Sequence, residues 1–188
     1  MARIRTTGSP YQGISGRVGN LVFRNTPNGV VVANRPRKTK SVSTNQKAVR
    51  NRFSDAAFYA REQMKDIAIK ELYESGVNSK MNSPYLVAVS DYLTAPKIGS
   101  IFTKSYQGQA GETVGIHAKD DFWVVAVMVQ IHDSAGKLIE SGEASQMMDS
   151  SCFWDYVTTQ KIAATKGCTI TAIAQDFAGN KGSKTITL

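Results

Sequence analysis

The fold of this chain is decided by its last stretch, Cys168-Thr-Ile-Thr-Ala-Ile-Ala-Gln-Asp-Phe-Ala-Gly-Asn-Lys-Gly-Ser-Lys-Thr-Ile-Thr-Leu188. Apolar and polar residues alternate over 168–175 and again over 183–188, and a period of two is typical of β-strands. Between the two runs, Asp176-Phe-Ala-Gly-Asn180 offers Gly and Asn, which tolerate the positive φ of a tight turn. The stretch therefore predicts a β-hairpin.

Four more strands are predicted before this hairpin. Short alternating runs, separated by turn signals at roughly 10 to 15 residues, cover 114–118, 122–132, 137–144 and 152–158. Together with the hairpin they predict an antiparallel β-sandwich of six strands. In the run 122–132 both rows are apolar, so we expect cover on both faces, from the helical region in preference to a partner subunit. The predicted core row is Val125, Val127, Val129 and Ile131, and the opposite row is Phe122, Val124, Ala126 and Met128.

The closing hairpin resembles that of bacterial immunoglobulin-like domains. In those domains the penultimate strand ends in A-x-D-x-A-G-N, which is matched by Ala174-Gln-Asp-Phe-Ala-Gly-Asn180. The resemblance covers roughly the last 75 residues, and it implies an immunoglobulin-like fold without implying a function.

Two helices are predicted before the sandwich. Ser43-Thr-Asn-Gln46 matches a capping box, and apolar residues then recur at helical spacing. This predicts a helix from about residue 44 to 75, with a break near Asp66. Ser83 as cap and Pro84 at the first helical position predict a second helix to residue 93. The apolar row of the first helix is Val49, Phe53, Ala56, Ala60, Met64 and Ile67.

The N-terminal region is predicted to be an extended basic arm followed by a hairpin. Residues 1–18 show no sustained period, whereas the β-branched runs 21–24 and 30–33 flank a turn that contains Asn28-Gly29. A lone hairpin is barely stable in water, so we expect it to pair with another sheet, pack on a helix or join a neighbouring subunit. The residues expected to pair strands in assembly are Leu21, Phe23, Val30, Val31 and Val32.

The Gly- and Pro-containing stretch 95–111 has the composition of a domain junction. We therefore expect an α+β protein of two domains. Residues 1–98 would hold the basic arm, the β-hairpin and the two-helix region, and residues 99–188 the immunoglobulin-like antiparallel β-sandwich.

A second resemblance lies at the front of the chain. Ser15-Gly-Arg-Val-Gly-Asn-Leu-Val-Phe-Arg24 is followed by Arg35-Pro and by a Gln- and Arg-rich helix start at 46–53. This pattern is similar to an uncharacterised family of Bacteroidota and their mobile elements, whose N-terminal motif is S-G-x-V-G-x-x-V-F-R. The resemblance implies no known activity.

Charge is distributed unevenly along the chain. Residues 1–54 carry eleven basic residues and no Asp or Glu, whereas residues 105–188 carry six lysines against nine acids. The basic front indicates either an anionic partner, nucleic acid included, or head-to-tail contact between copies. The residues expected to contact an anionic partner are Arg17, Arg24, Arg35, Arg37, Lys38, Lys40, Lys47, Arg50 and Arg52.

The sequence offers no constellation typical of catalysis. The acidic pair Asp120-Asp121 favours a solvated loop, with a Ca²⁺ site as the alternative. His117 and His132 are expected on the surface, and Cys152 and Cys168 are expected to be free thiols rather than a disulfide. We therefore expect no enzyme activity, cofactor, structural metal or small-molecule substrate.

The function expected from these features is that of a structural or assembly subunit, for example of a virion or filament. The chain would form a homo-oligomer or bind other structural subunits, joined through the arm and the sheet edges. The alternative is a nucleic-acid-associated binding protein, and an adhesin-like module is a third possibility. No apolar run near the length of a membrane span and no secretory signal follow the printed start, so we expect cytoplasmic synthesis, with incorporation into a virion or extracellular assembly left open.

Overall fold

The computed structural model describes residues 2–4, 15–26, 29–36, 41–162 and 164–188. The chain forms two compact units, Met1–Gln46 and Lys47–Leu188. The predicted boundary lies further along, between residues 98 and 99, and the observed division groups the helical region with the sandwich. Each unit is described below by itself.

The first unit is a four-stranded antiparallel sheet in the order β1-β4-β3-β2. Its strands are β1 (Ala2–Ile4), β2 (Gly16–Val18), β3 (Leu21–Thr26) and β4 (Gly29–Asn34). The predicted hairpin is the β3–β4 pair, in which Phe23 lies opposite Val32. β1 and β2 lie within the stretch predicted to be an extended arm; each has three residues, too few for an alternating pattern to be recognised.

Three helices lie in the described part of the chain: α1 (Thr44–Gln63), α2 (Ile67–Glu74) and α3 (Pro84–Leu93). The predicted capping box forms, because the Gln46 amide donates to Ser43 Oγ and the Ser43 amide donates to Gln46 Oε1, both at 3.2 Å. The predicted break falls at Asp66, whose carboxylate caps α2. Ser83 caps α3, with Pro84 in its first turn. Among the described residues, no helix is both long and apolar enough to cross a membrane.

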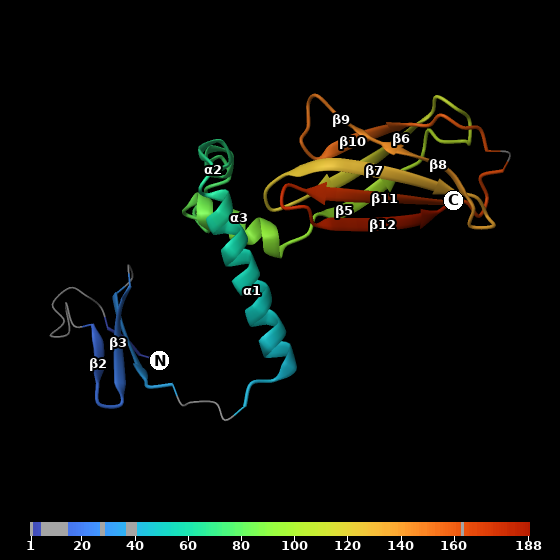
Figure 1. The fold of residues 1–188 in the computed structure, drawn as a ribbon. Coiled ribbons are helices and arrows are strands. Elements are labelled where there is room, and N and C mark those ends of the chain that lie inside the picture. Colours follow the sequence, from blue (N-terminus) through green and yellow to red (C-terminus); the bar gives the residue numbers. More distant parts are fainter. Residues whose placement is uncertain (1, 5–14, 27–28, 37–40, 163) are drawn as a thin grey trace. The chain divides into compact units, whose positions relative to one another are not determined.

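The remaining strands form two four-stranded antiparallel sheets, shown in Figure 1. One has the order β5-β6-β10-β9, and the other has the order β12-β11-β7-β8. The strands are β5 (Lys97–Phe102), β6 (Thr113–Lys119), β7 (Val124–His132), β8 (Leu138–Glu143), β9 (Ser145–Gln146), β10 (Phe153–Val157), β11 (Thr169–Asp176) and β12 (Lys181–Thr187). The six predicted strands are present, whereas β5 and β9 were not predicted.

The core of the sandwich lies between these two sheets. Buried side chains from β6 and β10 pack against buried side chains from β7 and β11 in one cluster. Prominent members are Ile116, Trp154, Val129 and Ile170. The antiparallel β-sandwich expected from the sequence is therefore present.

The two sheets approach each other closely where β12 begins beside β5. A Cβ atom added to Gly182 would lie 1.7 Å from the carbonyl oxygen of Pro96, the residue before β5. Lys184 on β12 also donates to the carbonyl oxygen of Gly99 on β5. The last strand of the sandwich is thus held against its first strand.

The predicted core row of β7 is interrupted by an irregularity in the pairing of β7 with β11. Gln175 lies opposite Ala126 while Asp176 lies opposite Val124, so Val125 is an extra residue on β7. Val127, Val129 and Ile131 are buried as predicted, but Val125 is 43% exposed. The predicted inward position of Val125 is wrong because the bulge reverses the alternation there.

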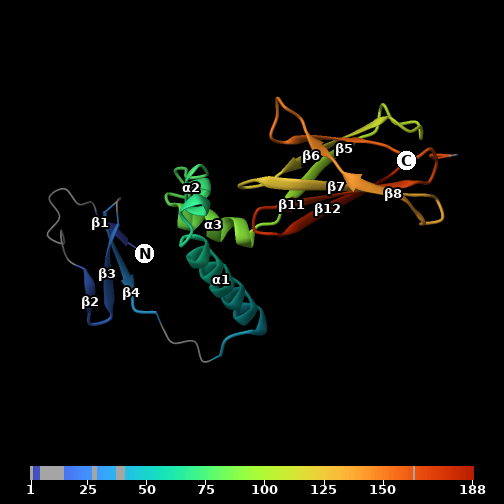
Figure 2. The same ribbon diagram turned by 45° about the horizontal axis from the view of Figure 1, so that its top comes forward.

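α2 and α3 lie at one end of the sandwich, near the β11–β12 turn (Figure 2). Tyr73 on α2 is buried there, with its ring centroid 4.8 Å from that of Phe122 and 5.5 Å from that of Phe177. Phe122 precedes β7 and Phe177 follows β11, so the β6–β7 loop and the β11–β12 turn both contribute to the helical core. The helical region covers this end of the outward row of β7, whereas Met128 further along is 42% exposed.

Candidate functional site

The residues expected to pair strands all lie on the two inner strands of the N-terminal sheet. β4 pairs with both β1 and β3, and β3 pairs with both β4 and β2. The five predicted residues therefore take part in strand pairing inside the chain. Within the described residues of this sheet, β1 and β2 have one partner each, so these two strands carry its edges open to strand addition.

The two faces of the N-terminal sheet differ in character. Phe23 and Val32 lie opposite each other and share a face with Leu21 and Val30, because side chains alternate along a strand. Phe23 and Val30 are buried, Val32 is half-buried, and Leu21 is 40% exposed. Four of the five predicted strand-pairing residues thus form an apolar face; the fifth, Val31, belongs to the other face.

The opposite face of the N-terminal sheet carries arginines. Arg24 lies opposite Val31, and Arg17 lies opposite Val22. Since Val22 and Arg24 are two residues apart on β3, both arginines lie on the face that contains Val31. Both are exposed. The register thus places two of the predicted anion-contacting residues on one side of the sheet.

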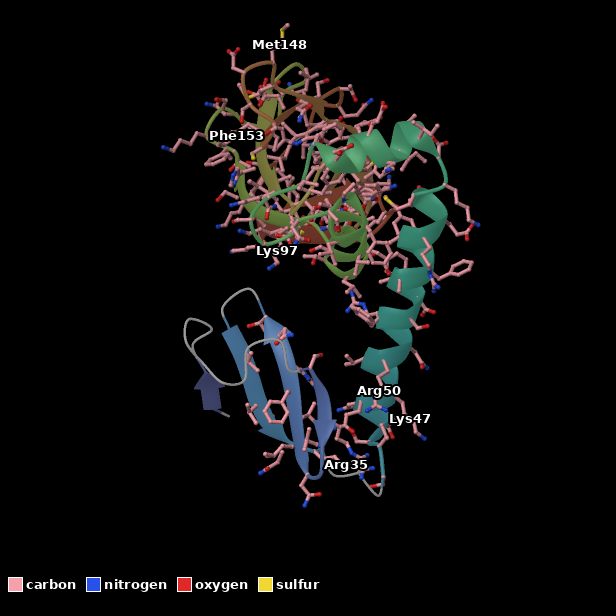
Figure 3. All side chains as sticks on the ribbon, turned by 90° about the vertical axis from the view of Figure 1, so that its left-hand side faces the viewer. Arg35, Lys47, Arg50, Lys97, Met148 and Phe153 are labelled. Carbon is pink, nitrogen blue, oxygen red and sulfur yellow. The ribbon has the colours of Figure 1, made fainter. Side chains whose placement is uncertain are left out.

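The other predicted anion-contacting residues are distributed over several segments. Arg35 is exposed after β4. Lys47, Arg50 and Arg52 are exposed in the first turns of α1, where Figure 3 shows Lys47 and Arg50 extending from the helix. Arg52 donates to the carbonyl oxygen of Leu93 at 2.8 Å. Arg37, Lys38 and Lys40 lie outside the described residues.

The apolar row predicted for this helix is buried at two of its six positions, while Met64 is half-buried and Ile67, which begins α2, is 74% exposed. Ala56 and Ala60 are fully buried, whereas Val49 is 69% exposed and Phe53 is 57% exposed. These four residues lie on one side of the helix, because spacings of four, three and four residues return to the same face. The N-terminal half of α1 therefore presents an exposed apolar strip, defined here as Val49 and Phe53.

Three carboxylates meet at the junction between the helices and the sandwich. They belong to Asp91 on α3, Asp120 in the loop before β7, and Asp176 at the end of β11. One carboxylate oxygen of each lies within 4.8 Å of the others. Asp91 is 0% exposed and Asp176 is 1% exposed, while Asp120 is half-buried. We call these three residues the carboxylate cluster.

Asn180 holds one side of the carboxylate cluster. Its backbone amide donates to Asp176 Oδ1 at 2.6 Å, and its side-chain Nδ2 donates to Asp176 Oδ2 at 2.8 Å. The same Nδ2 donates to the carbonyl oxygen of Asp91 at 2.9 Å. The turn motif that predicted the hairpin therefore also connects the hairpin to α3.

A chain of tyrosine hydroxyls reaches the other side of the cluster. Tyr73 donates from its hydroxyl to Asp91 Oδ2 at 2.7 Å and lies 2.9 Å from the hydroxyl of Tyr59. Burial raises the pKa of Asp91 to about 7, although the bond from Tyr73 lowers it. The neighbouring carboxylates of Asp176 and Asp120 raise this pKa further.

Two oxygens of the cluster are left without a hydrogen bond of good geometry. Asp120 Oδ2 accepts from the Phe122 amide at 3.1 Å, but Asp120 Oδ1 and Asp91 Oδ1 are buried atoms that make no such bond in the described part of the chain. Burial also raises the pKa of Asp120. Asp120 lines a surface groove together with Lys80, Met81 and Asp121, whereas Asp91 and Asp176 do not line it.

The sequence indicated little of this cluster. The sequence pairs Asp120 with Asp121, but Asp121 is exposed and lies outside the cluster. The sequence around Asp176 indicates only a turn, and Asp91 lies in a stretch that indicates only a helix. One feature of the sequence nevertheless indicates a buried polar contact at Asp91. This Asp lies in the largely apolar run 84–93, and burying a carboxylate without a partner is costly.

The histidines and cysteines do not contribute to the carboxylate cluster. His117 on β6 is half-buried, with its ring centroid 4.9 Å from that of Phe153, and His132 lies at the end of β7. Cys152 and Cys168 are both free thiols, as the sequence favoured. Cys168 is buried, whereas Cys152 is half-buried.

Comparison with known proteins identifies no family. No protein-family model matches the chain, and no curated protein matches it. The similar solved structures include CopC from Methylosinus trichosporium OB3b, at 15% identity and a TM-score of 0.36 over 48% of this chain and 87% of CopC.

Two further solved structures are similar over smaller shares of their own length. An engineered protein matches at 20% identity and a TM-score of 0.35 over 49% of this chain and 20% of the other. The catalytic module of the multi-modular glycogen-degrading pneumococcal virulence factor SpuA matches at 15% identity and a TM-score of 0.28 over 43% of this chain and 13% of that one. At these TM-scores none of the three matches bears on function.

Proposed function

We propose that this chain is a non-enzymatic structural or assembly protein, a subunit of a larger particle such as a virion or filament. The observation that carries the proposal is the exposed apolar surface of the N-terminal sheet beside two open edges. Val18 on the edge strand β2 is 63% exposed, and Leu21 on β3 is 40% exposed. Such edges and surfaces are suited to strand addition and to packing against a neighbouring copy.

The N-terminal sheet has too small a core to be stable by burial alone. Phe23 and Val30 are the large apolar side chains buried among the described residues of this unit. Burying one such side chain contributes about 1.5–3 kcal/mol, whereas ordering one residue of backbone costs about 1–2 kcal/mol. An ordered sheet of four strands therefore needs further burial, which a partner would supply.

The exposed apolar strip on α1 supports the same function. Val49 and Phe53 are large, apolar and more than half exposed, next to the exposed cations Lys47 and Arg50. A mixed apolar and basic surface of this kind fits a partner surface that is apolar at its centre and acidic at its rim.

We assign the sandwich to the immunoglobulin-like type, on the A-x-D-x-A-G-N turn that joins β11 to β12 and on the presence of two antiparallel sheets. Immunoglobulin-like domains serve in many assemblies and adhesins, so the assignment agrees with a structural function and does not specify a partner.

The assembly proposal is tested by measuring mass in solution. Light scattering would compare the full chain with a chain of residues 41–188, which retains all of the second compact unit. We expect large species from the full chain at both low and high salt, because apolar burial resists screening, and monomers from the truncated chain. Monomers of the full chain at every concentration and salt level would show the assembly proposal to be wrong.

Nucleic-acid binding is the second candidate, and the arginine face of the N-terminal sheet favours it. Arg17 and Arg24 are exposed on one face, and the ion pair found among the described residues, Lys65 with Glu62, does not involve them. If they contact phosphates, the affinity for duplex DNA falls steeply with salt, and replacing both by Ser lowers the slope of log K against log salt by about 2. Replacing Lys137 and Lys166 by Ser is the control, and absence of DNA binding at low salt excludes this function.

A further inference from the structure

We propose that the carboxylate cluster of Asp91, Asp120 and Asp176 is a Ca²⁺ site that fastens the helices to the sandwich. The proposal goes beyond the assembly function, because it concerns the second compact unit and holds whether or not the chain assembles.

The charge of the cluster is the first argument. Three carboxylates lie within 4.8 Å of one another, and no Lys or Arg in the described part of the chain forms an ion pair with them. Like charges at this distance repel one another, and a shared proton or a bound cation would relieve the repulsion. Lys80 lines the groove beside Asp120, but it is not within ion-pair distance of a cluster carboxylate.

The second argument is independent of charge and concerns hydrogen bonding. Asp91 is 0% exposed, yet its Oδ1 makes no hydrogen bond of good geometry among the described residues, and the backbone amide of Ala178 is a weaker neighbour that lowers the pKa of Asp91. The buried Oδ1 of Asp120 likewise makes no such bond, with the Asp121 amide as its weaker neighbour. More than about nine in ten buried polar groups are paired, and an unpaired one costs about 1–3 kcal/mol. Two poorly paired oxygens in one cluster indicate a ligand that is bound by oxygen lone pairs.

The donor set indicates the class of the ligand. The cluster offers carboxylate oxygens without an imidazole or a thiolate, which suits a hard cation rather than zinc or copper. Ca²⁺ binds oxygens at about 2.3–2.6 Å, so two opposite ligands stand roughly 5 Å apart. The separation of 4.8 Å or less therefore allows one ion to contact all three carboxylates. Mg²⁺ needs shorter bonds in a stricter octahedron, so we expect it to bind more weakly.

The site connects segments that are distant in sequence. Asp91 comes from α3, Asp120 from the β6–β7 loop and Asp176 from the β11–β12 hairpin. Asp120 also lines a surface groove, so the site lies next to a route by which an ion could enter. An ion bound here would hold both sheets and the helical region together, and it would be absent from the unfolded chain, so it would stabilise the folded state.

The experiment compares thermal unfolding of the full chain after dialysis against a chelator with unfolding in about 1 mM Ca²⁺, about 1 mM Mg²⁺ and NaCl of matched ionic strength. We expect a rise of several degrees in Tm with Ca²⁺, a smaller rise with Mg²⁺ and none with NaCl. Isothermal titration calorimetry of the same chain is expected to show one Ca²⁺ bound per chain.

Two neighbouring variants localise the site. Asp120→Asn removes a ligand from a half-buried loop position and is expected to weaken Ca²⁺ binding by roughly tenfold or more and to abolish the rise in Tm. Asp121→Asn changes the same charge one residue away at an exposed position and is expected to retain both.

Three results would overturn the proposal. They are the absence of a Ca²⁺ binding heat on the unmodified chain, an equal response to NaCl, and an unchanged Ca²⁺ response in Asp120→Asn. The absence of a Ca²⁺ binding heat is measured on the unmodified chain, so it does not depend on whether any variant folds. It would mean that a shared proton, and not a cation, relieves the repulsion between the carboxylates. None of these outcomes bears on the assembly proposal, which is tested by mass.

Discussion

Asn180 serves both the hairpin and the helical region with one side chain. Its Nδ2 lies within hydrogen-bond distance of Asp176 Oδ2 and of the carbonyl oxygens of Asp91 and Tyr92. Asn180→Ala would leave these buried acceptors without their donor. We expect it to lower the free energy of unfolding by about 1–3 kcal/mol, measured by urea denaturation.

A matched control for Asn180→Ala is Asn82→Ala, because Asn82 is exposed just before the cap of α3. We expect that change to stay within about 0.5 kcal/mol of the unmodified chain. Equal effects of the two substitutions would show that the connection through Asn180 adds nothing to stability.

Asp91 should make the stability of the chelator-treated chain depend on pH. Its pKa is raised from the ordinary value of 3.8 to about 7 on folding, so the folded chain holds a proton there that the unfolded chain has released. The contribution of Asp91 to the free energy of unfolding is therefore largest below about pH 4, and it is lost as the pH rises through 7. We expect a lower Tm at pH 8 than at pH 5.5 in the presence of EDTA.

Asp91→Asn separates this titration from that of other groups. The amide cannot ionise but can still accept the hydrogen bond from Tyr73, so we expect its Tm to change less between pH 5.5 and 8 than that of the unmodified chain. Asp121→Asn, at an exposed position, is expected to keep the full pH dependence. A Tm that rises with pH in the unmodified chain but not in Asp91→Asn would contradict the direction of the shift.

At the scale of elements, the contact between β12 and β5 leaves no room for a side chain. A Cβ at position 182 would lie 1.7 Å from the backbone oxygen of Pro96, which cannot rotate away. We expect Gly182→Ala to destabilise the chain by about 3 kcal/mol or more, measured by chemical denaturation. Gly115→Ala on β6 is the control, because its Cβ would meet nothing closer than 3.5 Å.

Helix ends could be predicted from the sequence because their signals are local. The cap at Ser43, the break at Asp66 and the start after Ser83 each depend on hydrogen bonds within three residues. Six strands of the sandwich could be predicted for a similar reason, since alternation is visible within each run.

What could not be predicted depends on neighbours that are distant along the chain. The prediction that Val125 points inward is wrong, because a bulge in the pairing of β7 with β11 turns this side chain outward. The carboxylate cluster joins Asp91, Asp120 and Asp176, whose spacing along the chain gives no sign of proximity. Val49 and Phe53 fit the apolar period of α1 but are exposed, since periodicity shows a face without showing what covers it.

At the scale of the whole molecule, assembly can be tested with two phenylalanines of the same helix. Phe53 is 57% exposed on the strip with Val49, and Phe58 is 63% exposed on another side of α1. If the strip is an interface, Phe53→Ser weakens self-association by about 2 kcal/mol or more, whereas Phe58→Ser has little effect. Sedimentation equilibrium measures both, and equal effects would exclude the strip as an interface.

The position of β11 in its sheet determines when the sandwich can fold during synthesis on the ribosome. β11 pairs with both β7 and β12, and β12 closes against β5, yet β11 and β12 are synthesised after every other strand of the sandwich. Until residues 169–187 leave the ribosome, the backbone of β7 is unpaired on the side where β11 will bind. The apolar side chains of the core are then exposed, because β11 is missing. The sandwich must therefore fold after translation of its last strand, and during that interval its exposed edge is a target for chaperones and a risk for aggregation.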